Sequence, residues 1–371
     1  MIALLRPLLG WAGDGFGIER SALPAFTGVG GGASRHLVQR AAASMALRLT
    51  AALLSLLSSV ALARFLGAQG FGAYSYALTL VGLVAVPVTL GVPQLLVREV
   101  AAYGARGQWG EMGGLLRRAN QVALGGSLLL ALAAFAVSSH FLGGVDAGGY
   151  AAFAVGLVML PLMALAAMRM AALQGLGYVV LRQLPEGVCK PLLLLVFVFS
   201  ASVLMGHGQL TPVRAMAMHL VAAGLAFLLG AWFLHTRMPP HVRNVDPQYE
   251  HRIWLREVMP LLLLGGVQFA NQQVGLLMVG SLKGPEAAGL YQVATRVAEC
   301  IPLVLMAANA VLAPLVSQLY ARGDIGRLQQ LVTATSRAVF YCSAPIALAL
   351  IIGGWWLLPA VFGADFARAS T

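Results

Sequence analysis

Long apolar runs separated by short polar segments fill the chain from about residue 41 to residue 352. Each run approaches the roughly 20 apolar residues that a helix needs to cross the hydrocarbon layer of a membrane. Strands of a membrane β-barrel would instead alternate apolar and polar residues over short segments. The pattern therefore predicts nine transmembrane helices, at 41–63, 73–97, 119–142, 149–173, 183–205, 214–236, 258–281, 289–316 and 332–352.

Composition agrees with a membrane protein, because 59% of the residues are hydrophobic and 10% are charged. Soluble domains carry roughly 25% charged residues. The net charge of +11 could indicate nucleic-acid binding, but basic residues also collect in cytoplasmic loops. With the N-terminus in the cytoplasm, only Arg64, Arg214, Lys283 and Arg368 fall on the outer side, and Arg48, Lys190 and Arg296 fall within spans. This distribution predicts a cytoplasmic N-terminus and no nucleic-acid partner.

A phrase that follows the first predicted helix returns after the seventh. The segment LGAQGFGAYSYA begins at Leu66, and LKGPEAAGLYQVA begins at Leu282. A shift of 217 positions brings Gly67 onto Gly284, Gly72 onto Gly289, Tyr74 onto Tyr291 and Ala77 onto Ala294. A weaker repeat, YGARG and YARG, follows the next helix in each case. We interpret this as duplication of a six-helix unit, with the glycines permitting a tight turn and close helix contact.

The repeat defines the predicted organisation of an all-α polytopic membrane protein. We expect a flexible N-terminal tail (1–36), a first lobe of six helices (37–236), a cytoplasmic linker (237–257) and a partial second lobe (258–371). Six is an even number, so the two copies have the same orientation, and an axis along the membrane normal should relate them. The second lobe would hold three helices and the start of a tenth.

Polar side chains form stripes on several of the predicted helices. The stripes comprise Ser44, Arg48, Ser55 and Ser59 in the first helix, Gln183, Glu186 and Lys190 in the fifth, Gln268, Asn271, Gln272 and Gln273 in the seventh, and Gln292, Arg296 and Glu299 in the eighth. Charges inside hydrocarbon are costly and usually face a cavity or a partner. Two lobes that face each other across a polar cleft would produce this pattern.

Simpler interpretations remain open for each of these residues. Arg48 could extend to the cytoplasmic surface, because it lies only a turn or two inside the membrane. Glu186 and Lys190 could neutralise each other as an i,i+4 pair, and Arg296 and Glu299 as an i,i+3 pair. Gln272 could bond a neighbouring helix.

Enzymatic chemistry has no support in the sequence. No phosphate-binding glycine loop and no paired histidines with metal-ligand spacing occur, and the outer loops are about ten residues long. The three cysteines (Cys189, Cys300 and Cys342) lie inside apolar runs, and His219 and His235 are as consistent with packing as with proton transfer. We expect neither enzymatic activity nor a cofactor or metal.

Residues 62–99, LARFLGAQGFGAYSYALTLVGLVAVPVTLGVPQLLVRE, resemble the polysaccharide-biosynthesis flippases, the Wzx-type branch of the multidrug/oligosaccharidyl-lipid/polysaccharide (MOP) superfamily. That family has an A-R-x-L-G…F-G-x-Y phrase after its first helix. The segment LLMVGSLKGPEAAGLYQVATRVAE, which ends at Glu299, looks like its counterpart in the second half. The resemblance covers roughly residues 37–367.

The resemblance implies a flippase of the bacterial inner membrane that moves undecaprenyl-diphosphate-linked oligosaccharide repeat units by alternating access, for surface polysaccharides such as O-antigen. A polysaccharide polymerase and glycosyltransferases are candidate partners. Seven residues become candidates for binding the diphosphate or the glycan: Arg48, Lys190, Gln268, Asn271, Gln272, Gln292 and Arg296. Arginine's planar fork suits phosphate oxygens. Glu186 and Glu299 are the candidates for ion coupling.

The sequence departs from this family in two places. Many relatives have an acid in the seventh helix, where this chain has Asn271, Gln272 and Gln273, and relatives have twelve or more helices. We therefore expect the chain to be C-terminally incomplete. The alternatives are a MATE-like cation or drug antiporter, which would want an acid in the first helix where this chain has Arg48, a lipid II flippase, and an inactive truncated remnant.

Overall fold

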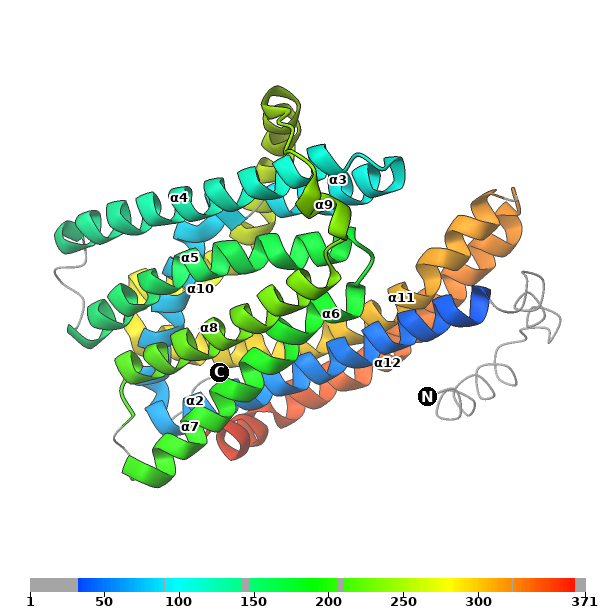
Figure 1. Cartoon of the computed structure of the whole chain (residues 1–371). Coiled ribbons are helices and arrows are strands. Elements are labelled where there is room, and N and C mark those ends of the chain that lie inside the picture. Colours follow the sequence, from blue (N-terminus) through cyan, green and yellow to red (C-terminus); the bar gives the residue numbers. More distant parts are fainter. Residues whose placement is uncertain (1–32, 90, 142–146, 206–209, 322, 364–371) are drawn as a thin grey trace. The chain divides into compact units, whose positions relative to one another are not determined.

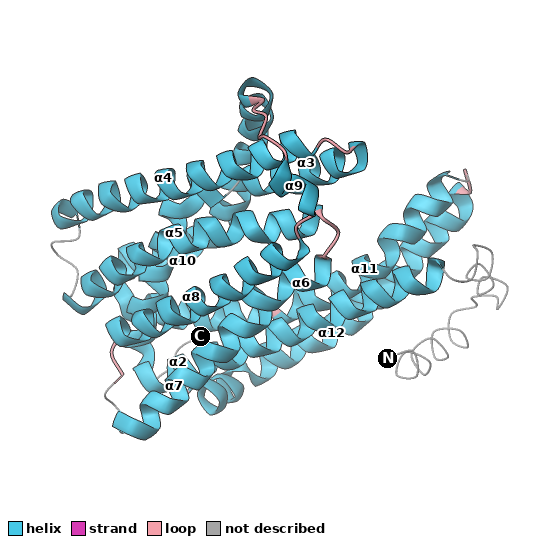
Figure 2. Ribbon diagram, in the orientation of Figure 1, coloured by secondary structure: helices cyan, strands magenta, loops and turns pink. Residues whose placement is uncertain are grey.

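The computed structural model describes residues 33–89, 91–141, 147–205, 210–321 and 323–363. This described part consists of helices and short connections, without a strand (Figure 2). The chain divides into two compact units, Met1–Ser44 and Met45–Thr371, and every contact discussed below lies within the second. The predicted flexible tail lies mostly outside the described residues, and its end at 33–36 already belongs to the first helix.

Figure 1 labels the helices in chain order. They are α2 (Ala33–Thr89), α3 (Val92–Arg106), α4 (Trp109–Phe141), α5 (Ala147–Gly175), α6 (Val179–Gln183), the π-helix η2 (Leu184–Cys189), α7 (Lys190–Met205), α8 (Pro212–Arg237), α9 (Pro240–Asn244), α10 (His251–Ala298), α11 (Cys300–Ala321) and α12 (Ile325–Phe362). Seven helical segments in the described part are long and apolar enough to cross a membrane, and two of these have 47 and 45 residues. The predicted class, an all-α polytopic membrane protein, is confirmed.

The two longest helices each bend at a repeated glycine. Gly67 interrupts α2 with φ 68° and ψ 178°, and Gly284 interrupts α10 with φ 86° and ψ −178°. Side chains rarely tolerate a positive φ, whereas glycine has no Cβ and adopts it readily. The two positions that the 217-residue shift aligns therefore have the same backbone conformation, at the turn between two predicted helices. This supports the interpretation of the repeat as a structural one.

The second pair of repeated glycines brings α2 and α10 into contact. A Cβ at Gly72 would lie 1.7 Å from the carbonyl oxygen of Pro285, and one at Gly289 would lie 2.3 Å from the carbonyl oxygen of Ala68. Only glycine fits at either position. Residues that are equivalent in two copies meet each other next to a two-fold axis, as in a symmetric dimer interface. The contact between Gly72 and Gly289 thus agrees with the predicted duplication and confirms the close packing expected of these glycines.

Two further contacts lie along the same two helices, and a third joins the N-cap of α3 to α10. The ring of Tyr76 lies against Gly280, where a Cβ would be 2.3 Å from the ring. Phe269 lies beside Gly82, and the backbone of Leu262 lies beside Gly91. Small residues allow helix backbones to approach closely in membranes, where packing replaces the hydrophobic effect. The contact between α2 and α10 therefore depends on glycine at most of its positions.

The rest of the first predicted lobe packs around α5, which contacts α3, α4 and α8 (Figure 1). Alanine dominates these contacts: Ala152, Ala164 and Ala222 are fully buried. At the end of the first transmembrane segment, Arg64 donates to α12, with 2.7 Å from Nε to the carbonyl oxygen of Val361 and 2.5 Å from a terminal nitrogen to that of Ala360. A guanidinium at a helix C-terminus satisfies carbonyl groups that lack partners and suits the negative end of the helix dipole.

Three predicted spans differ from the helices observed. The span at 73–97 ends at Thr89, because Gly91 has φ 83° and Pro93 lies in the first turn of a new helix, α3. The span at 183–205 contains the π-helix η2, where Pro185 lacks the amide that an α-helix needs. The span at 289–316 is divided at Glu299 between α10 and α11, with Pro302 in the first turn of α11.

The predicted linker (237–257) lies along α4. The amide of Gln248 donates to the carbonyl oxygen of Gly110 at 3.0 Å, and the ring of His241 stacks on Trp109 with centroids 5.8 Å apart. A Cβ at Gly114 would lie 1.8 Å from the carbonyl oxygen of Gln248. The linker therefore packs against α4, and Gly110 and Gly114 of α4 leave room for its backbone.

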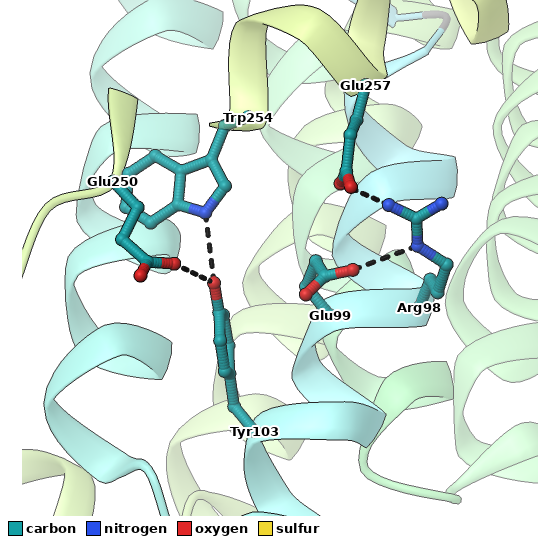
Figure 3. A network of polar contacts seen from close by, with 6 residues as sticks. All are labelled: Arg98, Glu99, Tyr103, Glu250, Trp254 and Glu257. Atoms are coloured by element: carbon teal, nitrogen blue, oxygen red, sulfur yellow. Dashed lines mark hydrogen bonds and ion pairs between the residues drawn. The ribbon is translucent and has the colours of Figure 1, made fainter. Parts of the chain in front are cut away.

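A polar network then joins α3 to the start of α10 (Figure 3). The hydroxyl of Tyr103 donates to Glu250 at 2.8 Å and accepts from the indole nitrogen of Trp254 at 3.1 Å. Burial, with a smaller effect of the neighbouring Glu250, raises the pKa of Tyr103 to about 12, so the phenol keeps its proton at neutral pH. Beside this group, Arg98 forms ion pairs with Glu99 and Glu257.

Candidate functional site

A buried tyrosine–histidine pair lies between α2 and α8. The hydroxyl oxygen of Tyr74 and Nδ1 of His219 are 2.6 Å apart and share a hydrogen bond. The two residues are 4% and 8% exposed, so the bond is shielded from solvent. Buried polar groups are costly unless paired, and each of these residues satisfies the other. The pair is therefore a hydrogen-bonded polar site buried among the apolar side chains of the first predicted lobe.

Lys190 approaches this pair from the start of α7. Its ammonium forms an ion pair with Glu186 in the π-helix η2, and both side chains are partly exposed. Lys190 also lies close enough to His219 for its charge to act on the imidazole. Single π-helical turns inside α-helices frequently occur at functional sites. The widened turn at Leu184–Cys189 thus directly precedes one of the few charged side chains inside a predicted span.

Arg296 approaches the same pair from α10, a helix of the second predicted lobe. One terminal nitrogen of its guanidinium lies 3.1 Å from a carboxylate oxygen of Glu299, and the charge acts on the hydroxyl of Tyr74. Its Nε is buried and has no hydrogen-bond partner among the residues that the structure describes. A buried donor without a partner is uncommon and is available to a ligand that brings an acceptor.

Lys190 and Arg296 come from different predicted lobes, and each lies within electrostatic range of one member of the buried pair. With their carboxylates they form what we call the cation cluster, which comprises Tyr74, Glu186, Lys190, His219, Arg296 and Glu299. Guanidinium and ammonium groups in a partly desolvated setting suit the oxygens of phosphate. Arg296, whose buried Nε lacks a partner among the described residues, is therefore the member of the cluster best suited to hold an anionic group.

None of the other predicted site residues forms a described hydrogen bond or ion pair with a member of the cation cluster. Gln292 precedes Arg296 by one helical turn and is half-buried. Gln268, Asn271 and Gln272 are exposed on α10 before its bend, and no hydrogen bond of theirs is found within the described ranges. Arg48 is exposed and lies close enough to Arg182 for the two positive charges to repel.

Sequence reasoning did not find the tyrosine–histidine pair. The sequence places Tyr74 in the repeated phrase, and it leaves His219 open to both packing and proton transfer. The two residues are 145 positions apart, and no local spacing connects them. The available signal was a tyrosine and a histidine in separate apolar runs, since each needs a polar partner when buried.

Two bent helices related by a repeat, in a chain with seven described helical segments long and apolar enough to cross a membrane, define a polytopic membrane protein. The solved structures agree in fold. An inward-facing multidrug resistance MATE family transporter of the MOP superfamily matches with a TM-score of 0.71 and 14% identity, over 89% of this chain and 80% of that one. A MOP superfamily transporter from Pyrococcus furiosus, described as having a binding pocket of reverse polarity, matches with a TM-score of 0.63 and 15% identity, over 90% and 75%.

The chain belongs to the polysaccharide biosynthesis protein family, whose family model matches residues 37–320. No curated protein sequence matches it. Family and fold together make it a multi-pass membrane flippase or transporter, and not an enzyme. The resemblance drawn from residues 62–99 is therefore confirmed.

Proposed function

We propose that this protein flips lipid-linked oligosaccharides, with the sugar attached through a diphosphate to a polyprenyl chain such as undecaprenol, across the bacterial inner membrane for surface polysaccharide synthesis. The observation that carries this proposal is the buried Nε of Arg296, which has no hydrogen-bond partner within the described part of the chain, with Lys190 as a second cation within electrostatic range of the Tyr74–His219 pair. A diphosphate is the most highly charged part of such a lipid. It would bind where cations are held inside the membrane.

Alternating access follows from the same arrangement. A group held by residues of both lobes can be exposed first on one side and then on the other when the lobes rock around it. We propose that 37–236 and 258–371 move as these two bodies, with the N-terminus on the cytoplasmic side. In this arrangement the glycan stays attached to the bound diphosphate. It extends away from it along the polar residues Gln268, Asn271, Gln272 and Gln292.

The cation antiporter alternative has less support. It calls for an acidic residue in the first helix, and the whole of α2 contains neither aspartate nor glutamate. All the charged residues of α2 are arginines, and Arg48, which lies within the predicted first span, would repel a cationic drug. We assign Arg48 to the cytoplasmic entrance, where it and Arg182 attract the diphosphate headgroup.

The test is export of surface polysaccharide in cells that depend on this protein. Arg296→Ala removes the planar donor that suits phosphate, and we expect export to fall at least tenfold while the protein still inserts into the membrane. Arg337→Ala is the matched control, because Arg337 is also an arginine within a helix long and apolar enough to cross a membrane, but it is exposed and has no described contact with the cation cluster. Normal export by Arg296→Ala at wild-type protein levels would contradict the proposed role.

A further inference from the structure

Each cation of the cluster already has a carboxylate one helical turn away. Lys190 is paired with Glu186, four residues before it, and Arg296 is paired with Glu299, three residues after it, at 3.1 Å. The two pairs carry no net charge. A site built only to attract an anion would leave its cations unpaired. The presence of both carboxylates therefore calls for an explanation beyond anion binding.

The carboxylates are held loosely enough to be displaced. The side chain of Glu299 is 57% exposed and that of Glu186 is 34% exposed, while Arg296 is 31% and Lys190 is 26% exposed. In both pairs the carboxylate is the more exposed member, so it is the member that an incoming anion reaches first. The cations are thus more enclosed than their carboxylates, and an incoming anion can replace the carboxylates without moving the cations.

Replacement depends on the charge that the incoming group carries. A carboxylate has one negative charge, and so does the headgroup phosphate of most phospholipids. A diphosphate offers more charge and more acceptor oxygens, so it gains more from Lys190 or Arg296 than the carboxylate paired with that cation does. Binding sites often achieve selectivity by including groups whose interactions with a competing ligand are unfavourable. Singly charged lipids surround this protein in far greater amounts than its substrate, and the carboxylates oppose them.

We propose that Glu186 and Glu299 are internal competitors that occupy Lys190 and Arg296 until a headgroup with more than one negative charge displaces them. This inference rests on the proposed function and deepens it. The competitors exclude singly charged phospholipids from the site. They also promote release, because the carboxylates return to their cations once the diphosphate begins to leave.

The test measures binding of farnesyl diphosphate, a short prenyl diphosphate, by the full chain in nanodiscs, with phosphatidylglycerol as the singly charged competitor. Glu186→Gln and Glu299→Gln keep the size of each side chain and remove its charge. We expect each variant to bind farnesyl diphosphate about fivefold more tightly, the upper range for one partly exposed ion pair. Dissociation should slow, and phosphatidylglycerol should compete more strongly than it does with the wild type.

Glu111→Gln is the matched control, because Glu111 lies on α4 and its described partner is Gln108. It should bind like the wild type. Variants that bind farnesyl diphosphate no more tightly than the wild type, and reject phosphatidylglycerol equally well, would overturn the competitor role while leaving the proposed function intact. If the wild type does not bind farnesyl diphosphate, or if Arg296→Ala binds it equally well, the proposed function fails and this inference fails with it.

Discussion

Tyr103 joins two parts of the chain that lie about 150 residues apart. Its hydroxyl donates to Glu250 and accepts from Trp254, and the residue is 3% exposed. A single hydroxyl thus satisfies a buried indole and a carboxylate at the point where the linker enters α10 (Figure 3). The loss of this hydroxyl would leave the buried indole nitrogen without its acceptor.

We therefore expect Tyr103→Phe to lower the free energy of unfolding by about 1–2 kcal/mol. Thermal unfolding of the purified protein in detergent measures this, with Tyr320→Phe as the control, since Tyr320 is 71% exposed. The pKa of about 12 sets the pH dependence. Because burial raises this pKa, the stabilisation is complete below about pH 10 and is lost as the pH rises towards 12. Equal stability of the two variants at pH 8 would contradict the role of the network.

At the residue scale, local pairs could be predicted from the sequence and distant ones could not. The ion pairs Glu186–Lys190 and Arg296–Glu299 follow from helical spacing, and both are observed. The bond between Tyr74 and His219 depends on how α2 and α8 pack, and the electrostatic influence of Lys190 and Arg296 on it depends on how α7 and α10 pack against them. No rule of local spacing contains that information.

At the element scale, the contact between α2 and α10 depends on the absence of side chains. We expect Gly72→Ala to lower the free energy of unfolding by roughly 1–3 kcal/mol, because its Cβ would overlap the carbonyl group of Pro285 and the helices would have to separate. Detergent melting of the full chain measures the effect.

Gly125→Ala provides the control for this prediction. Gly125 lies in α4, and a Cβ there would meet no atom within 4 Å. Alanine stabilises a helix relative to glycine by roughly 0.5–1 kcal/mol, so this variant should be at least as stable as the wild type. If both variants melted at the same temperature, close approach of α2 and α10 would not stabilise the protein.

The apolar pattern predicted where helices lie but not how they are interrupted. The runs located every long helix, because hydrophobic length is the dominant signal in a membrane chain. The turn glycines Gly67 and Gly284 were also predicted, since the repeat marked them. The π-helix at Pro185 and the break at Glu299 were missed, because a proline permits several local adjustments and packing selects among them.

At the scale of the whole molecule, the duplicated phrase explains the arrangement of the site. Equivalent glycines touch each other, and cations from both sides of that contact act on one buried pair. The proposed alternating access requires that the two predicted lobes, 37–236 and 258–371, move as two similar bodies around this centre. The family and the fold establish a flippase or transporter, and the cation cluster is the basis for proposing its substrate.

The most direct test of this account is translocation of a fluorescent prenyl-diphosphate-linked oligosaccharide in reconstituted vesicles. The probe's accessibility to an external quencher reports which leaflet holds it. We predict that the wild-type chain moves the probe between leaflets, and that the double variant Lys190→Ala, Arg296→Ala slows this at least tenfold. The same probe with a single phosphate should move more slowly than the diphosphate. Equal translocation by the wild type and the double variant would contradict the central claim.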